Sequence, residues 1–168
     1  GQGGGGVSVG GCERGGPGHD KPLFGQGRDW VTEAGVMLLH PSGGAGGPGV
    51  TDKWTTQYIF PGGYNPALSE IVSANEGLRF MVTGVEVLRL HYAYTLDDWY
   101  DRTVAARAQI VALYDERFFR MWQFYLAGAG AAFHFGGLVN YQVQFAKNRH
   151  VLPITRDYMI EGERRLRR

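Results

Sequence analysis

An α/β fold with a helical block inserted near its end is the architecture that this sequence predicts. Two short apolar runs, Val7–Val9 and Val36–Leu39, are typical of buried strands, and a polar connection separates them. Two alternating runs, 80–90 and 138–145, predict further strands on either side of a long helical region. Because those strands must return to one sheet, we expect the helices between them to pack as a lid over its carboxyl end.

The first third of the chain is rich in glycine, since residues 1–50 hold 18 of the 27 glycines. Glycine adds no packing and loses more backbone entropy on folding than other residues, which weakens regular structure. We therefore expect few elements in this part beyond the two strands. Residues 43–49 contain no Lys-Ser or Lys-Thr of a phosphate-binding loop and are predicted to form a flexible loop.

The middle of the chain carries a turn signal and a helix signal. Pro61, Gly62 and Gly63 predict a turn. Residues 66–74 predict a helix that has a proline near its start and is closed by Gly77.

The lid is predicted to begin at a clear helix start. Thr95 is a capping residue type, and Asp97 and Asp98 place acidic side chains in the first turn. The helical region continues to about residue 135, with an interruption near 113–115. Residues 148–168 are predicted to form a polar tail with a short helix.

Composition excludes several classes of function. The net charge of +1 provides no general basic surface for nucleic acid. One cysteine, Cys12, cannot form an internal disulfide, and the remaining histidines, apart from His40, lack metal-ligand spacing. No apolar run approaches the roughly 20 residues of a spanning helix. We expect a cytoplasmic protein that binds neither nucleic acid nor metal.

Three polar residues follow predicted strands and form a candidate site. Glu13 follows the first strand, His40 ends the second, and Tyr92 follows the third. Ligands of open α/β sheets bind beyond the carboxyl ends of strands, so these side chains are candidates for convergence on one site. The alternative is that each is an ordinary polar residue of a loop.

One lid segment is unusually aromatic. Residues 118–126 include Phe118, Trp122 and Tyr125 and are apolar almost all the way around the helix. One interpretation is a buried core helix. The other is the wall of a pocket for a long apolar substrate, because ligand sites are lined mainly by apolar and aromatic side chains.

Several motifs resemble those of the cyclopropane-fatty-acyl-phospholipid synthases and the related mycolic acid cyclopropane synthases. Residues 58–71 read YIFPGGYNPALSEI, and residues 91–99 read HYAYTLDDW. They are followed by ERFFRMWQFYL at 116–126 and YQV at 141–143, in the order and spacing of that family. The resemblance is strong over 49–147 and weaker before it.

The resemblance implies a fold and a division of the chain. Family members have a class I methyltransferase fold, a Rossmann-like sheet whose last strand is antiparallel. This chain would be its C-terminal half, with residues 1–147 a partial S-adenosylmethionine-dependent domain, 95–135 its lid, and 148–168 a tail. The Gly-rich loop that holds the cofactor in the family has no counterpart in the sequence, so we expect the chain alone to be inactive.

The resemblance also implies a chemistry. The family transfers a methylene unit from S-adenosylmethionine to an unsaturated acyl chain of a phospholipid, and a bound bicarbonate removes a proton from the cationic intermediate so that a cyclopropane ring closes. By position, its bicarbonate ligands fall on Glu13, His40 and Tyr92, although this sequence has Cys-Glu-Arg-Gly-Gly where the family has Phe-Glu-His-Val-Gly. Phe118, Trp122 and Tyr125 would contact the acyl chain.

The sequence leaves alternatives open. A small-molecule methyltransferase of the same fold would keep the lid without the bicarbonate ligands, and a non-catalytic remnant would only bind lipid or a partner protein. If the family resemblance holds for function, the enzyme would work on phospholipid at the inner membrane surface. The lipid preference, methylation as against ring closure, and homo-oligomer formation stay open.

Overall fold

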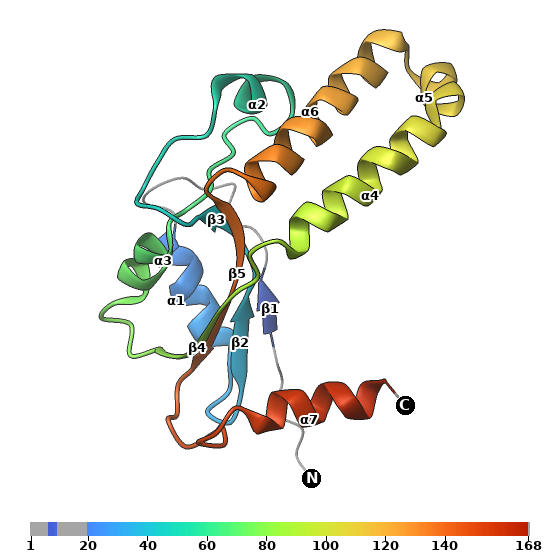
Figure 1. The fold of residues 1–168 in the computed structure, drawn as a ribbon. Helices are drawn as coiled ribbons and strands as arrows, with labels where there is room; N and C mark the ends of the chain where they lie inside the picture. The colour runs from blue at the N-terminus through green and yellow to red at the C-terminus, as the bar shows by residue number, and fades with distance from the viewer. Residues whose placement is uncertain (1–6, 10–19, 168) are drawn as a thin grey trace.

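The computed structural model of the chain describes residues 7–9 and 20–167. The described elements alternate between strands and helices before a group of three helices and a final strand (Figure 1). In chain order they are β1 (Val7–Val9), α1 (Asp20–Trp30), β2 (Val36–Leu39), β3 (Ser42–Gly44), α2 (Lys53–Tyr58), α3 (Leu68–Asn75), β4 (Met81–Val87), α4 (His91–Ala105), α5 (Arg107–Leu113), α6 (Glu116–His134), β5 (Leu138–Ala146) and α7 (Asp157–Leu166).

The last strand, β5, organises the sheet. β1 and β2 pair in parallel, whereas β2, β3 and β4 all pair with β5 in the antiparallel sense. β2 and β3 lie one after the other along the same edge of β5, and β4 takes the other edge. This confirms the predicted α/β sheet with an antiparallel last strand.

Alternation along β5 builds the main core. Val139, Tyr141, Val143 and Phe145 are buried, as the period-2 pattern predicted. They pack with residues of α1 and α3, which cover one face of the sheet, and Phe145 lies between the rings of Phe24 and Phe80. The strands β1 and β2 have the bounds that the sequence predicted.

The lid is confirmed as an insertion between β4 and β5. Figure 1 shows α4, α5 and α6 projecting beyond the carboxyl ends of β1 and β2. A second cluster of buried residues, including Ala93, Leu96 and Leu126, holds α4 against α6. The interruption near 113–115 is also confirmed, because α5 ends at Leu113 and the side chain of Asp115 caps α6 by accepting a hydrogen bond from the Phe118 amide.

The predicted helix start at Thr95 is wrong. The first helix begins at His91 and not at Thr95, because the chain turns directly out of β4 with the His91 amide donating to the Leu88 carbonyl. Thr95 lies inside the helix, where its hydroxyl donates back to the His91 carbonyl. Thr, Asp and Asp therefore mark a helix interior here.

Three further elements differ from the sequence prediction. Helices α1 and α2 were not predicted, and Ser42–Gly44 forms strand β3 where a loop was expected to begin. Gly43 explains the strand. A Cβ at this position would collide with the Pro66 carbonyl and with the Tyr141 ring at 2.5 Å, so only glycine allows this close pairing with β5.

Candidate functional site

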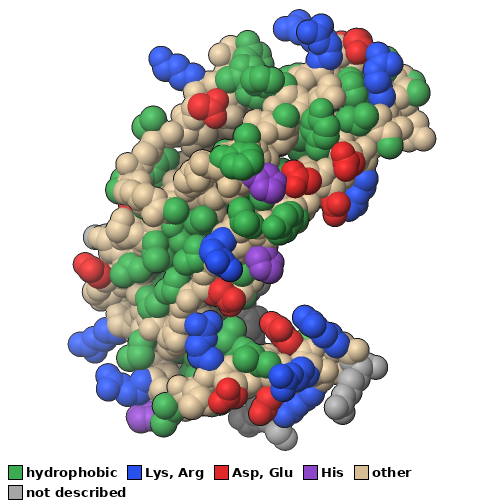
Figure 2. Space-filling view, viewed as in Figure 1, with side chains coloured by type: hydrophobic (Ala, Val, Ile, Leu, Met, Phe, Trp, Pro, Cys, Tyr) green, Lys and Arg blue, Asp and Glu red, His purple; other side chains and the backbone are tan. Residues whose placement is uncertain are grey.

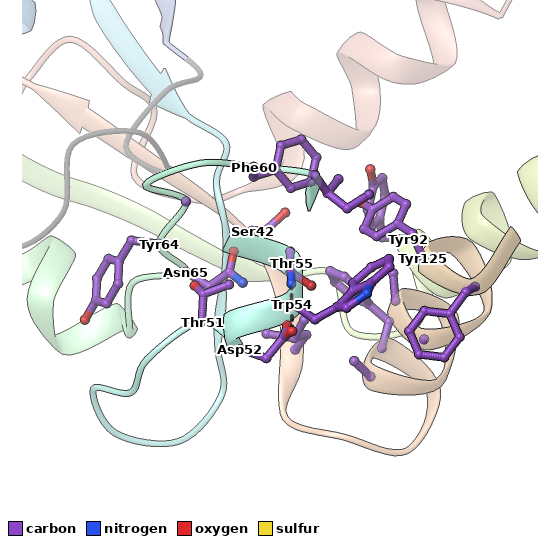
Figure 3. A pocket seen from close by; sticks show the side chains of 18 of the residues that line it. Ser42, Thr51, Asp52, Trp54, Thr55, Phe60, Tyr64, Asn65, Tyr92 and Tyr125 are labelled. Carbon is purple, nitrogen blue, oxygen red and sulfur yellow. Dashed lines mark hydrogen bonds between the residues drawn. The ribbon is translucent and has the colours of Figure 1, made fainter. Parts of the chain in front are cut away.

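A cavity of about 1080 Å³ lies between the lid and the sheet (Figure 3). Ser42 of β3 and Leu138 of β5 form its floor, and α2 with the following loop forms one wall. The other wall comes from Tyr92 of α4 and from one side of α6. The residues of α6 in this wall are Phe124, Tyr125, Gly128, Ala129, Ala132 and Phe133.

Local interactions fix the wall formed by α2 and its loop. Asp52 caps α2, since its carboxylate accepts from the Thr55 amide at 2.8 Å. Hydrogen bonds from the Thr55 side chain and from the Thr55 amide lower the pKa of Asp52. The predicted turn after α2 is confirmed. Pro61 and Gly62 occupy its centre, and the Gly63 amide closes it by donating to the Phe60 carbonyl at 2.8 Å. Gly62 has φ +73°, the conformation that favours glycine in a type II turn.

Seven aromatic side chains line the cavity, beside polar residues such as Asp52 and Asn65. Phe60 meets Tyr125 edge-on at 5.8 Å between ring centroids, and Tyr92 meets Phe133 in the same way at 5.0 Å. Trp54 of α2 contacts Phe124 of α6 at 4.9 Å and so joins the two walls. The lining therefore presents π-faces and edges to any occupant.

The Tyr125 phenol is in a poorly solvated position. Burial and, to a smaller extent, the charge of a nearby Tyr92 phenolate together raise the pKa of Tyr125 to about 12. Both effects disfavour the ionised form of Tyr125, so this hydroxyl stays neutral at physiological pH.

The raised pKa of Tyr125 has a measurable effect on stability at alkaline pH. The folded-state pKa of Tyr125 lies above the unfolded value of about 10. The contribution of the protonated Tyr125 phenol to the free energy of unfolding is therefore fully present below pH 10. It is lost as the pH rises to about 12. We expect Tyr125→Phe to remove one phenol that titrates near pH 12 at 295 nm. We also expect this variant to lose less stability than the wild type between pH 10 and pH 12 in urea unfolding. An unchanged titration curve would contradict this assignment.

The structure describes two of the three predicted catalytic residues, His40 and Tyr92. Glu13 lies outside the described residues. His40 follows β2 at the carboxyl end of the sheet and is exposed, and its Nδ1 lies 3.4 Å from the Gln142 side-chain nitrogen. Tyr92 lines the cavity in the first turn of α4, and Figure 3 shows its ring beside that of Tyr125. Their role as bicarbonate ligands stays a prediction.

The three predicted substrate contacts separate along α6. Tyr125 lines the cavity. Trp122 is partly buried, stacks obliquely on Tyr125 at 5.1 Å and packs against the core between α4 and α6. Phe118 lies near the start of α6, where its ring stacks on Tyr114 at 4.2 Å, and neither Phe118 nor Trp122 is among the residues that line the cavity. Of the three, Tyr125 is the side chain that the geometry favours as a substrate contact.

Polar residues of the sheet beside the cavity were missed from the sequence. Asn140 is buried, donates weakly to the Ser42 hydroxyl at 3.4 Å, and has no hydrogen-bond partner for its Oδ1 among the described residues. It shares with Gln142 the face of β5 opposite the aromatic core, as period-2 alternation requires. The signal available was the alternation of polar residues at 140, 142 and 144 within the last strand.

Comparison with known proteins decides the family. The sequence model of the mycolic acid cyclopropane synthetase family matches residues 6–143. This chain belongs to that family. Its resemblance to cyclopropane synthases, inferred from the motifs, is thereby confirmed.

Individual relatives agree with this assignment. A probable fatty acid methyltransferase from Pseudomonas putida is 35% identical over 143 residues, which are 82% of this chain and 36% of the relative. Cyclopropane-fatty-acyl-phospholipid synthase from Escherichia coli K12 is 33% identical over 141 residues, 84% of this chain and 37% of the relative. The chain thus spans little more than a third of these relatives.

A solved structure confirms the fold. Mycolic acid cyclopropane synthase CmaA1, crystallised with SAH and CTAB, superposes with a TM-score of 0.75 at 29% identity, over 83% of this chain and 53% of that one. The described residues therefore have the Rossmann-like arrangement of S-adenosylmethionine-dependent methyltransferases. The division of the chain at residue 147 and the lid bounds of 95–135 remain predictions as domain limits.

Proposed function

We propose that this chain forms the acyl-chain side of an S-adenosylmethionine-dependent lipid-modifying transferase, in which the cavity between α2 and α6 holds an unsaturated phospholipid acyl chain. The observation that carries the proposal is the cavity itself. Its volume of about 1080 Å³ is slightly above the roughly 300–1000 Å³ of small-molecule pockets, and rings line it on both sides. A long apolar ligand fits that shape and chemistry.

The lining also suits the electronic demands of the reaction. Addition of a methyl group to an alkene leaves positive charge on the acyl chain, and aromatic faces stabilise cations when water is excluded. Phe60, Tyr92 and Tyr125 supply such faces. Tyr125 remains an uncharged phenol because burial raises its pKa to about 12.

The donors beside the cavity fit an anion that accepts a proton. Bicarbonate requires hydrogen-bond donors, and His40, the Ser42 hydroxyl and the Tyr92 hydroxyl all lie at the end of the sheet from which α4 leaves. Gln142, 3.4 Å from His40, would orient its imidazole. We propose that these residues and Glu13 hold the bicarbonate, which when bound would take the proton released during ring closure.

S-adenosylmethionine would supply the transferred carbon. Residues 10–19, which follow β1, lie outside the described part of the chain, so no cofactor contacts are assigned to them. The described residues contribute the acyl pocket and the polar edge beside it.

A ligand-binding experiment tests the acyl pocket directly. We expect the chain to bind a monomeric cis-unsaturated acyl ligand, such as an oleoyl lysophospholipid below its micellar concentration. The signal is a change in tryptophan fluorescence, because Trp54 lines the cavity. Gly128→Phe should weaken binding by at least about tenfold. Gly128 lines the cavity, and no neighbouring atom lies within 4 Å of the point where a Cβ would stand, so the new ring can fill the space.

A matched variant controls for the effect of replacing a glycine in a helix by phenylalanine. Gly162→Phe makes the same replacement in α7, at a position that also has open space, and should leave acyl binding unchanged. Equal binding by Gly128→Phe and the wild type would refute the pocket. Binding of small polar methyl acceptors in preference to the acyl ligand would favour the alternative small-molecule methyltransferase.

A further inference from the structure

The outward face of α6 is an uninterrupted apolar stripe beside the cavity. Phe124 is 63% exposed and Phe135, just after the helix, is 89% exposed. Between them the exposed positions are Ala127, Gly128 and Ala131. These five positions follow the 3.6-residue period and therefore form one stripe along the helix.

Two arginines lie beside the stripe near the start of α6. Residues 118–137 contain no acidic residue. Arg117 and Arg120 are exposed near the start of α6, on the same side as the stripe, and have no carboxylate within ion-pair distance in the described part of the chain. The stripe with its two arginines is about 27 Å long, from the rise of 1.5 Å per residue.

The stripe is continuous with the cavity. Phe124 and Gly128 belong to both, because they are exposed and also line the cavity. Ala127 and Ala131 belong to the stripe alone. Figure 2 shows hydrophobic side chains over the region of α2 and α6, and basic side chains with acidic ones among them near the upper end of the lid. A ligand that crosses this rim enters the cavity from the side on which the stripe is exposed.

We propose that the stripe, together with Arg117 and Arg120, docks the lid on an anionic phospholipid bilayer. The proposal rests on the proposed function, because it identifies the surface from which the acyl chain enters. Phenylalanine and small apolar side chains bury at the boundary between headgroups and acyl chains, and arginines next to them pair with lipid phosphates. Residues 118–137, which carry the apolar positions of the stripe, contain no acidic residue, and this limits repulsion by the anionic headgroups.

No helix in the described residues is long and apolar enough to cross a bilayer. Docking by a surface stripe is a different mode of contact, because the helix lies in the interface plane. A second group of basic residues lies at the end of α7, with Arg164 and Arg165 in the helix and Arg167 at its C-cap, and Figure 1 places α7 at the opposite end of the molecule from α2 and α6. Docking through α7 would hold the cavity away from the lipid.

Vesicle flotation with the whole chain tests the proposal. Vesicles of phosphatidylethanolamine with phosphatidylglycerol should bind the chain, and binding should decrease with added salt and with phosphatidylcholine alone. Ala131→Glu should weaken binding on the order of tenfold, because a charge would enter the apolar stripe. Arg120→Gln should weaken it about fivefold, the usual effect of one basic residue near an anionic surface.

Matched variants on other helices provide the controls. Ala105→Glu places the same charge on an exposed alanine in the last turn of α4, and Arg102→Gln removes an exposed arginine of α4 that pairs with Asp98. Both should bind vesicles like the wild type. Neither Ala131 nor Arg120 lines the cavity, so binding of the monomeric oleoyl lysophospholipid should be unchanged in their variants.

The outcomes separate the two proposals. Normal vesicle binding by Ala131→Glu, or loss of binding only in an Arg164→Gln/Arg165→Gln variant, would overturn the docking surface and leave the pocket intact. A concentration-dependent dimer in sedimentation velocity that Ala131→Glu dissociates would also overturn it, since a second copy would then cover the stripe. Failure of the monomeric ligand to bind would instead refute the pocket.

Discussion

Phe145→Ala should lower the free energy of unfolding by about 3–5 kcal/mol, the usual cost of removing a large buried aromatic side chain. Phe145 is fully buried in β5, and its ring lies 5.3 Å from that of Phe24 and 5.4 Å from that of Phe80. These neighbours come from α1 and from the segment before β4. The void left by the substitution would therefore weaken the packing of both segments against β5. Urea unfolding followed by circular dichroism measures the loss.

Phe135→Ala is the matched control for that measurement. Phe135 is 89% exposed after α6, and its replacement should change the free energy of unfolding by no more than about 0.5 kcal/mol. A comparable loss in both variants would show that the ring of Phe145 is not part of a tightly packed core. A cost below about 1 kcal/mol for Phe145→Ala would lead to the same conclusion.

His40→Ala should lower turnover by about 100-fold or more when the chain is placed in a catalytic context. The proposed role of His40 is to hold the proton acceptor, and positioned proton transfer contributes roughly 10²–10⁴-fold to rates. The context is a chimera in which this chain replaces the matching segment of the Escherichia coli synthase, which supplies the rest of that protein. Cyclopropane acyl chains are measured by lipid analysis, with the unmutated chimera as the reference.

Two further variants make the result specific. His150→Ala changes an exposed histidine beyond β5 and should leave turnover unchanged. Gln142→Leu removes the side-chain nitrogen that lies 3.4 Å from His40 Nδ1 and should lower turnover less than His40→Ala does, with the KM for S-adenosylmethionine little changed. Undiminished turnover in His40→Ala would remove His40 from the site, and a selective rise in KM would assign it to cofactor binding.

Local sequence patterns were sufficient to predict several elements, because the conformation of these elements is set by residues that are close together in the chain. Period-2 alternation predicted β5, since a strand with one face on a core must alternate. Pro61 and Gly62 predicted the turn beside the cavity, because their backbone preferences match its geometry. The family resemblance predicted the antiparallel last strand, whereas the position after a strand predicted Tyr92 as a site residue and the aromatic run predicted Tyr125.

Other features depended on contacts between distant residues. Strand β3 exists because Gly43 allows the backbone to approach Tyr141, a contact between segments far apart in the chain that glycine content alone does not reveal. Helix α4 begins at His91 and not at Thr95, because the exit from β4 fixes the first turn before any capping residue is reached.

Tertiary packing also determined the different environments of the aromatic residues in the lid segment 118–126. The sequence made Phe118, Trp122 and Tyr125 equivalent candidates for a pocket wall. Helix α6 directs Tyr125 into the cavity and Trp122 toward the core shared with α4, whereas Phe118 stacks near the far end of the lid. By itself the sequence determined that this helix is apolar on nearly every side. Only the packing of α6 against α4 and α2 decided which side became core, which became pocket and which stayed exposed, because burial depends on the neighbours that each face meets.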